Sequence, residues 1–326
     1  MTELRTDEDV LIAGAGPIGL ACAISARRRD LRPLVVDGGA IVHSIARCPI
    51  GMTFFTTPEK LEIGDHPLAC AGQKPTREEA LMYYRGVVRT EDLRVRTYTR
   101  LTGARADRGA IEADLETRRG QERLRCRRLI LATGYFDHPN MLGVPGEDLP
   151  HVSHYFDEAH PSCGRDVVVI GGKNSAAEAA LELFRAGARV TLVHRRAQLG
   201  ETIKYWVRPD IENRIKAGEI AARFEAEVRR LEQGRVIIAH RRKEEALPAD
   251  RVYALTGYHP DFDLFRRLGI RLDAETLRPD CDPDTLETNV PGVYMAGSIT
   301  RGRAISEVFI ENGRFDGEKI FAQNRA

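Results

Sequence analysis

Two glycine-rich runs carry the chemistry that the sequence suggests most directly. The first is Gly14-Ala15-Gly16-Pro17-Ile18-Gly19, which matches the spacing G-x-G-x-x-G. In such a run the first glycine makes a tight turn, the second lets the backbone approach a pyrophosphate, and the third lets a helix pack close to a strand. The pyrophosphate then lies at the helix N-terminus, where N–H groups and the helix dipole attract anions. The first run therefore predicts a dinucleotide-binding turn.

The second run repeats this pattern with one change. It reads Gly171-Gly172-Lys173-Asn174-Ser175-Ala176, so that Lys173 stands where the pattern has its second glycine. A side chain at this place weakens the match, but a lysine can add positive charge beside a pyrophosphate. We expect residues 171–175 to bind a second dinucleotide.

The residue that follows each second predicted strand differs in charge. Asp37 lies 23 residues after Gly14, where a carboxylate can bond the ribose hydroxyls of an adenine nucleotide. The same offset from Gly171 leads to His194-Arg195-Arg196. Arginine accommodates a 2′-phosphate that a carboxylate would repel. The first site is therefore predicted to suit FAD or NAD and the second NADPH, and the alternative is that the basic cluster is only a charged strand end.

Apolar runs around both turns supply the strands and helices that would position them. Their periodicity predicts strands over 10–13, 34–36, 166–170 and 189–193, and helices over 20–28 and 179–184. Hairpin-like strands are expected over 111–117 with 123–131, and over 236–240 with 251–255. The predicted fold class is α/β, with two Rossmann-like, three-layer dinucleotide-binding domains.

The order of these parts indicates that the second domain is inserted into the first. Each half ends on a Thr-Gly turn, Thr133-Gly134 and Thr256-Gly257, and residues 143–147 resemble a linker. Residues 1–146 and 255–326 are predicted to form the FAD-binding domain, and residues 147–254 the NADPH-binding domain.

The last part of the chain is expected to complete the FAD site. A strand over 293–296 precedes Gly297 and Ser298, and a helix is predicted from about Ala304, with Ile305, Val308 and Phe309 on one face. The positive end of that helix would face a reduced flavin.

Composition excludes several classes of partner. The 49 basic and 48 acidic residues nearly cancel, so nothing favours a nucleic acid or an anionic membrane. No apolar stretch approaches about 18 residues, and residues 1–9 lack the apolar core of a signal peptide. We expect a cytoplasmic protein whose six cysteines are thiols, with no metal site despite the nearby His151, His154 and His160.

Several motifs resemble the low-molecular-weight thioredoxin reductase group of flavoprotein disulfide reductases, and within it the bacillithiol disulfide reductases. The two glycine runs and two Thr-Gly turns carry the broader resemblance. The closer one rests on stretches spread over nearly the whole chain: 53–55, 64–65, 154–156, 158–161, 171–175, 179–183, 203–206, 256–261, 287–289 and 309–315. It implies FAD and NADPH as cofactors, a low-molecular-weight thiol disulfide as substrate, and a homodimer or homotetramer.

The sequence departs from these families at two places. Thioredoxin reductases have a CxxC motif just before the second glycine run, whereas residues 151–164 contain only Cys163. Bacillithiol disulfide reductases have a cysteine within the first glycine run, at the position of Ile18. A redox protein acceptor is therefore an alternative to a small disulfide. The related possibilities are a ferredoxin/flavodoxin–NADP reductase, which also lacks CxxC, and a flavin- and NADPH-binding sensor without turnover.

Cys48 is the one remaining candidate for a catalytic thiol. It lies 11 residues after Asp37, and Ser44-Ile45-Ala46-Arg47-Cys48 resembles the Ser-x-x-x-Cys motif of single-cysteine coenzyme A disulfide reductases. The adjacent Arg47 could lower the pKa of the thiol. The alternative is a passive, half-buried thiol. The other cysteines are predicted to be structural: Cys22, Cys70, Cys126, Cys163 and Cys281.

Overall fold

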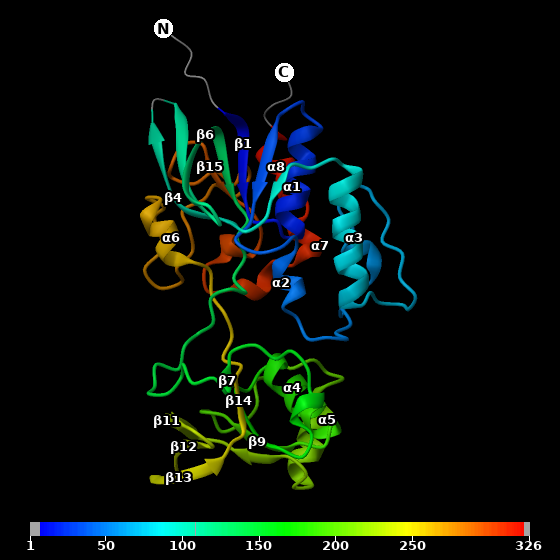
Figure 1. The fold of residues 1–326 in the computed structure, drawn as a ribbon, viewed down its shortest axis with the longest axis vertical. Helices are drawn as coiled ribbons and strands as arrows, with labels where there is room; N and C mark the ends of the chain where they lie inside the picture. Colours follow the sequence, from blue (N-terminus) through cyan, green and yellow to red (C-terminus); the bar gives the residue numbers. More distant parts are fainter. Residues whose placement is uncertain (1–6, 108, 323–326) are drawn as a thin grey trace. The chain divides into compact units, whose positions relative to one another are not determined.

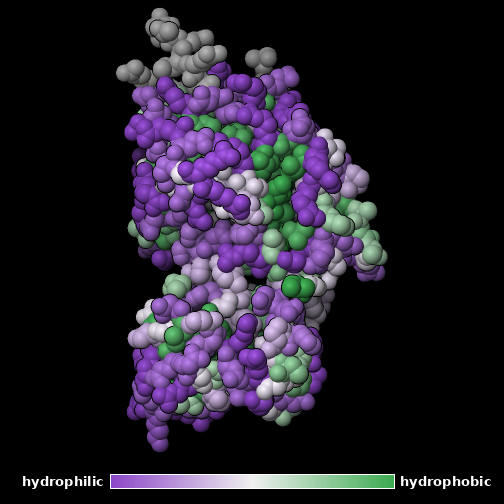
Figure 2. All heavy atoms as spheres, viewed as in Figure 1, coloured by the Kyte–Doolittle hydropathy of each residue, from purple (hydrophilic) through white to green (hydrophobic). Residues whose placement is uncertain are grey.

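A computed structural model describes residues 7–107 and 109–322 (Figure 1). The described chain forms two compact units. Unit 1 takes in residues up to 47, 51–138 and those from 259 onward, and unit 2 takes in 48–50 and 139–258. On the face seen in Figure 2, hydrophilic residues cover most of the surface of both units. The assignment of FAD to residues 1–146 and 255–326, and of NADPH to residues 147–254, stays a prediction.

Unit 1 is built on a seven-stranded sheet in the order β3-β2-β1-β6-β5-β4, with β15 also paired to β6. Strands β1, β2, β3, β6 and β15 run parallel, whereas β5 is antiparallel to both β4 and β6. The strands are β1 (Glu8–Ala13), β2 (Pro33–Val36), β3 (Val95–Arg96), β4 (Thr99–Asp107), β5 (Ala110–Thr117), β6 (Gly120–Leu131) and β15 (Val293–Met295).

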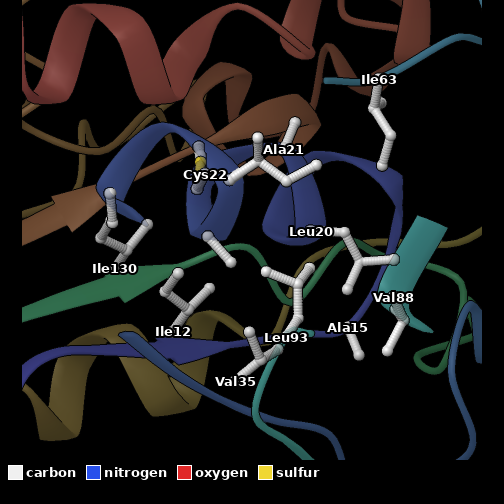
Figure 3. Close-up of a cluster of buried hydrophobic side chains, with 14 of the residues drawn as sticks. Ile12, Ala15, Leu20, Ala21, Cys22, Val35, Ile63, Val88, Leu93 and Ile130 are labelled. Atoms are coloured by element: carbon white, nitrogen blue, oxygen red, sulfur yellow. The ribbon is translucent and has the colours of Figure 1, made fainter. Parts of the chain in front are cut away.

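Helices cover both faces of this sheet. On one face α1 packs against β1, β2 and β6 around Leu20, Cys22 and Ile130 (Figure 3). On the other face Phe262 and Phe265 of α6 join the strand residues of a second core. The helices of unit 1 are α1 (Pro17–Arg27), α2 (His43–Ala46), α3 (Arg77–Thr90), α6 (Phe262–Arg267), α7 (Ile310–Gly313) and α8 (Asp316–Ile320).

Unit 2 has a five-stranded sheet in the order β10-β9-β8-β14-β7 and a three-stranded sheet, β11-β12-β13. Helix α4 covers one face of the parallel sheet through Ala177 and Leu181, and the small sheet covers the other through Ile238. The strands are β7 (Val152–Ser153), β8 (Asp166–Ile170), β9 (Arg189–Val193), β10 (Ala221–Arg223), β11 (Ala226–Glu232), β12 (Arg235–His240), β13 (Lys243–Pro248) and β14 (Arg251–Ala254), and the helices are α4 (Asn174–Arg185) and α5 (Arg208–Lys216).

Two predicted elements are wrong. Strand β12 pairs with β11 and β13, whereas residues 251–254 form strand β14 of the parallel sheet, between β8 and β7. Residues 252–255 are all buried because β14 is covered on both faces, and single-sequence periodicity does not separate such a strand from a hairpin strand. No helix runs on from Ala304, because Ile305–Glu307 form a single 3-10 turn and Val308 is extended. The next helix, α7, begins at Ile310, where Asn312 Oδ1 accepts the Phe309 N–H at 2.8 Å.

Candidate dinucleotide-binding sites

The first glycine turn, residues 14–19, leaves room for side chains at only one of its glycines. Gly14 has φ +115°, and a Cβ there would lie 2.2 Å from the carbonyl oxygen of Ala132. A Cβ on Gly19 would lie 1.9 Å from the oxygen of Gly14. Around Gly16 no atom lies within 4 Å of a Cβ, so the space above its backbone is open. This open cradle at the N-terminus of α1 fits a pyrophosphate.

Asp37 at the end of β2 holds this turn. Its Oδ2 accepts the Ala15 N–H and its Oδ1 accepts the Gly39 N–H, both at 2.7 Å. Burial raises the pKa of Asp37, and the two N–H donors oppose that shift. The carboxylate therefore fixes the backbone around the cradle, a role that its position in the sequence did not suggest. Its predicted bond to a ribose stays a prediction.

Ile18 lies in a slot formed by two glycines from the end of the chain. Its Cδ1 would be 2.8 Å from a Cβ on Gly297 and 2.6 Å from a Cβ on Gly313. Gly297 is held in turn by Asp316, whose Oδ2 accepts its N–H at 2.7 Å, and burial raises the pKa of this carboxyl. The position at which related reductases carry a cysteine is thus filled by an apolar side chain that packs between backbones.

The other residues predicted to bind FAD differ in what they offer. Thr133 Oγ1 is buried and has no hydrogen-bond partner among the described residues, so a ligand could satisfy it. Gly134 has φ +67°, and Ser298 is buried. Ala304 is exposed and precedes only a 3-10 turn, so the helix N-terminus predicted there is absent.

The second glycine turn, residues 171–176, repeats the first one in unit 2. Gly171 has φ +155°, and a Cβ there would lie 2.6 Å from the oxygen of Leu255. A Cβ on Gly172 would lie 2.4 Å from the His194 ring. Lys173 is the exposed N-cap residue of α4, and Ser175 is exposed beside it. The turn therefore presents a lysine and a helix N-terminus, which together fit an anionic ligand.

Asn174 anchors a loop rather than presenting its amide to solvent. Its Oδ1 accepts the Lys204 N–H at 2.9 Å and its Nδ2 donates to the Thr202 carbonyl at 3.0 Å. The Gly200 N–H donates to the Gly172 carbonyl at 2.7 Å. Sequence reasoning missed this loop as part of the cradle, because a side-chain amide leaves no periodic signal of its partners.

The basic cluster consists of one partly buried imidazole, His194, and two exposed arginines. Burial, with Arg196 and Arg195 nearby, lowers the pKa of His194. The imidazole is therefore neutral at neutral pH. Arg195 and Arg196 are exposed at the end of β9, so they would supply the positive charge for a 2′-phosphate.

Cys48 is a partly exposed residue that follows α2. It belongs to unit 2 together with Ile50, whose N–H donates to the Asp157 carbonyl at 2.8 Å. The guanidinium of Arg47 lies 3.0 Å from a carboxylate oxygen of Asp137, so its charge is shared with an acid.

Cys22 and Cys126 are buried and Cys281 is partly buried, so these three thiols are poor nucleophiles at neutral pH. Burial raises the pKa of Cys126 and that of Cys281 to about 12, and that of Cys22 further. The prediction that they are structural is consistent with these environments.

In residues 7–107 and 109–322, no group of three or more His, Cys, Asp or Glu side chains could hold a metal ion. His154 instead lies 3.3 Å from Glu147, whose carboxylate accepts the N–H groups of Leu142 and Gly143. Among the same residues, every helix is too short or too polar to cross a membrane.

Comparison with known proteins identifies the family. The sequence model described as pyridine nucleotide-disulphide oxidoreductase matches residues 11–297. This chain belongs to that family. Membership confirms the predicted oxidoreductase class.

Relatives within the family confirm the closer resemblance. Bacilliredoxin reductase Bdr of Bacillus subtilis (strain 168) is 43% identical over 320 residues, which are 97% of each chain. The structure of bacillithiol disulfide reductase Bdr (YpdA) from Bacillus cereus has a TM-score of 0.94 at 42% identity, over 97% of this chain and 98% of that one. The thioredoxin reductase of T. acidophilum has a TM-score of 0.75 at 21% identity, over 98% of both chains, and shares the fold. The predicted fold class is confirmed.

Proposed function

We propose that this chain takes hydride from NADPH and reduces a bacillithiol-like, low-molecular-weight thiol disulfide by way of bound FAD. The observation that carries the proposal is the pair of cradles. Both begin at a glycine with positive φ and lead into a helix, but the carboxylate of Asp37 lies beside the first and two exposed arginines lie beside the second. The names of the Bacillus relatives, which are reductases of bacilliredoxin and of bacillithiol disulfide, support a thiol disulfide as the acceptor.

Unit 1 has the residues that would hold FAD. Gly14 and Gly19 keep the turn tight and Gly16 leaves its backbone open to a pyrophosphate, while Asp37 holds the Ala15 N–H in place. The flavin, when bound, supplies electron transfer between the nicotinamide and the disulfide. Further contacts would come from Pro17, Ile18, Thr133, Gly134, Gly297 and Ser298.

Unit 2 has the residues that would hold NADPH. The N-terminus of α4 and Lys173 would attract the pyrophosphate, and Arg195 and Arg196 would bond the 2′-phosphate. Neutral His194 packs against Gly172 and shapes the turn without adding charge. The contacts of Gly171, Asn174 and Ser175 complete the cradle.

Cys48 is the proposed thiol of the disulfide step. Its thiolate would attack one sulfur of the substrate, break the S–S bond and release the first thiol, leaving a mixed disulfide. Two electrons from NADPH would then reduce the mixed disulfide, release the second thiol and restore Cys48. Ile18 cannot take this role, because it has no thiol.

A panel of acceptors tests the proposal. Purified protein is mixed with NADPH or NADH and with one acceptor: the disulfide of bacillithiol, coenzyme A or glutathione, or ferredoxin. The rate of nucleotide oxidation is compared with that of a blank in which oxygen is the only acceptor. We expect a yellow protein that oxidises NADPH fastest with bacillithiol disulfide. Protein that stays colourless with added FAD, that prefers NADH, or that is accelerated only by ferredoxin would contradict the proposal. The same holds for protein that binds both nucleotides but transfers no electrons.

Substitution of Cys48 tests the thiol separately. We expect Cys48→Ser to lower disulfide turnover at least about 100-fold, since thiol exchange is lost, while NADPH still reduces the flavin at the wild-type rate. Cys70→Ser, which removes another partly exposed cysteine, serves as the matched control. Undiminished turnover in Cys48→Ser would exclude a catalytic thiol at this position.

Light scattering tests the predicted homodimer or homotetramer.

A further inference from the structure

Residues 197–206 connect the two ends of the cradle in unit 2. The segment starts after Arg195 and Arg196 and returns to the glycine turn, where the Gly200 N–H bonds to the Gly172 carbonyl. Asn174 then holds the segment further along through its side-chain amide. The ADP part of a dinucleotide spans the same two ends, because its pyrophosphate lies on the turn and its ribose at the end of the second strand. The segment therefore borders the cradle in which we propose that the dinucleotide binds.

Two aromatic rings stand at the end of this segment. Tyr205 is 83% exposed and Trp206 is 49% exposed. Their ring centroids lie 4.8 Å apart and their planes are 89° apart, so one ring braces the other edge-on. An aromatic ring exposed to this extent leaves a large apolar surface in water.

The pair is tied to the helix that opens the cradle. The Lys204 N–H donates to Asn174 at the first position of α4, and Lys204 Nζ lies 2.7 Å from a carboxylate oxygen of Glu178, one turn further along. The Lys204 ammonium also lies 5.7 Å from the Trp206 ring centroid. The backbone that carries the two rings is thus fixed to the first turn of α4, which borders the same cradle.

We propose that Tyr205 stacks on the adenine ring of the dinucleotide bound by unit 2, with Trp206 supporting it from the side. A purine has an apolar face that stacks on aromatic side chains whatever polar edges it carries. Arg195 and Arg196 would then recognise the phosphate and Tyr205 the base. This inference rests on the proposed function, since it adds the base-binding residue to the proposed NADPH site.

The tryptophan supplies a direct readout of binding. Trp206 is the one tryptophan of the chain, so its fluorescence reports on this loop. The FAD-loaded protein is titrated with NADP⁺, followed by Trp206 emission and by calorimetry. We expect Trp206 emission to change as NADP⁺ saturates. Unchanged emission at calorimetric saturation would overturn the role of Trp206.

Substitutions test the stacking. Tyr205→Ala should raise the Kd for NADP⁺ about tenfold, the scale of one lost base stack, and Tyr205→Phe should keep it within about twofold because the ring remains. Met141→Ala, which removes another exposed apolar side chain of unit 2, is the matched control and should bind as the wild type does. A wild-type Kd in Tyr205→Ala would overturn the inference, including the case in which only the KM for the disulfide changes.

Fragments of the nucleotide locate the contact and separate the two proposals. Tyr205→Ala should weaken 2′,5′-ADP by the same factor as NADP⁺ and leave nicotinamide mononucleotide unaffected. The opposite pattern would place the ring at the nicotinamide and overturn the inference. If the wild type prefers NAD⁺, the proposed use of NADPH fails. Tyr205→Ala should then still weaken NAD⁺, since adenine is common to both nucleotides.

Discussion

The two glycine turns have the same backbone plan but different chemistry around it. Gly14 and Gly171 both have positive φ, and both press against the carbonyl just after a neighbouring parallel strand, Ala132 in unit 1 and Leu255 in unit 2. The strand order therefore sets the shape of each turn. The chain thus contains the same kind of strand–glycine turn–helix unit twice, once in each unit.

The groups that hold the two turns differ in charge. In unit 1 the anchors are carboxylates: the partly buried Asp37 binds the turn and the buried Asp316 binds Gly297. In unit 2 the anchor is a neutral amide, Asn174, and the charges at the strand end are arginines. The two turns therefore differ in the charge of the groups beside them, and a carboxylate repels a 2′-phosphate whereas an arginine binds one.

The largest expected effect is a difference in stability between substitutions at Gly14 and at Gly16. Gly14→Ala should destabilise the protein by at least about 3 kcal/mol, because its Cβ would lie 2.2 Å from a backbone oxygen and its φ is positive. Gly16→Ala, the matched control, should fold normally and lose only FAD affinity, since its Cβ meets open space. Urea unfolding and flavin content measure the two outcomes. Equal stability of both variants would contradict the claim that Gly14, unlike Gly16, has no room for a side chain.

Reversing the charge at the second cradle should change the coenzyme. Arg195→Glu with Arg196→Glu should lower kcat/KM for NADPH at least about 100-fold, because two cations that bond the 2′-phosphate become anions. The value for NADH should stay within a few-fold. Arg229→Glu, on β11 of the same unit, is a control for a charge reversal outside the cradle. An equal loss of kcat/KM for NADPH and NADH would show that the two arginines do not recognise the 2′-phosphate.

Removing the acid at the first cradle should loosen the turn. Asp37→Asn loses one of two acceptors for backbone N–H groups, which should cost about 1–2 kcal/mol of stability and weaken FAD binding about tenfold. Flavin fluorescence during dilution measures the affinity. Asp65→Asn, at a carboxylate whose side chain is 87% exposed, should change neither quantity. If Asp37→Asn binds FAD as tightly as the wild type does, Asp37 does not contribute to the FAD site.

The buried carboxyl group of Asp316 should make the stability of unit 1 depend on pH. Burial raises the pKa of Asp316 in the folded protein, so the folded state keeps this proton to higher pH than the unfolded state does. The stability from the protonated form is present below the ordinary pKa of 3.8 and is lost as pH rises through the folded value. Asp316→Asn keeps an acceptor for Gly297 without this loss. Its stability relative to the wild type should rise from about pH 4 upward, and a constant difference would contradict this account.

The smallest effect is expected where the turns differ by one methyl group. Ala176 occupies the third glycine position of unit 2, inside α4, so Ala176→Gly should cost only about 1 kcal/mol. Gly19→Ala in unit 1 should cost clearly more, because its Cβ would meet the Gly14 oxygen. Thermal unfolding of the two variants compares them. Equal costs would show that the two turns do not differ at this position.

Much of the fold and of both cradles could be predicted because the signals are local. The strands at 166–170 and 189–193 have the predicted bounds. Glycine positions also follow from the sequence, since a positive φ excludes most side chains wherever it occurs. Helix α1 begins earlier than predicted, at Pro17, because the glycine turn itself leads into the first helical residue.

The sequence by itself determined the two glycine turns, the acid after one and the arginines after the other, and the family that these features resemble. Only the tertiary structure decided which residues hold the turns: Asp37 on Ala15, Asp316 on Gly297, and Asn174 on residues 202–204. It also decided that Ile18 packs between Gly297 and Gly313, and that β12 pairs with β13. The reason is physical: a turn depends on the φ of its own residues, whereas an anchor needs a partner that the chain brings close only when it folds.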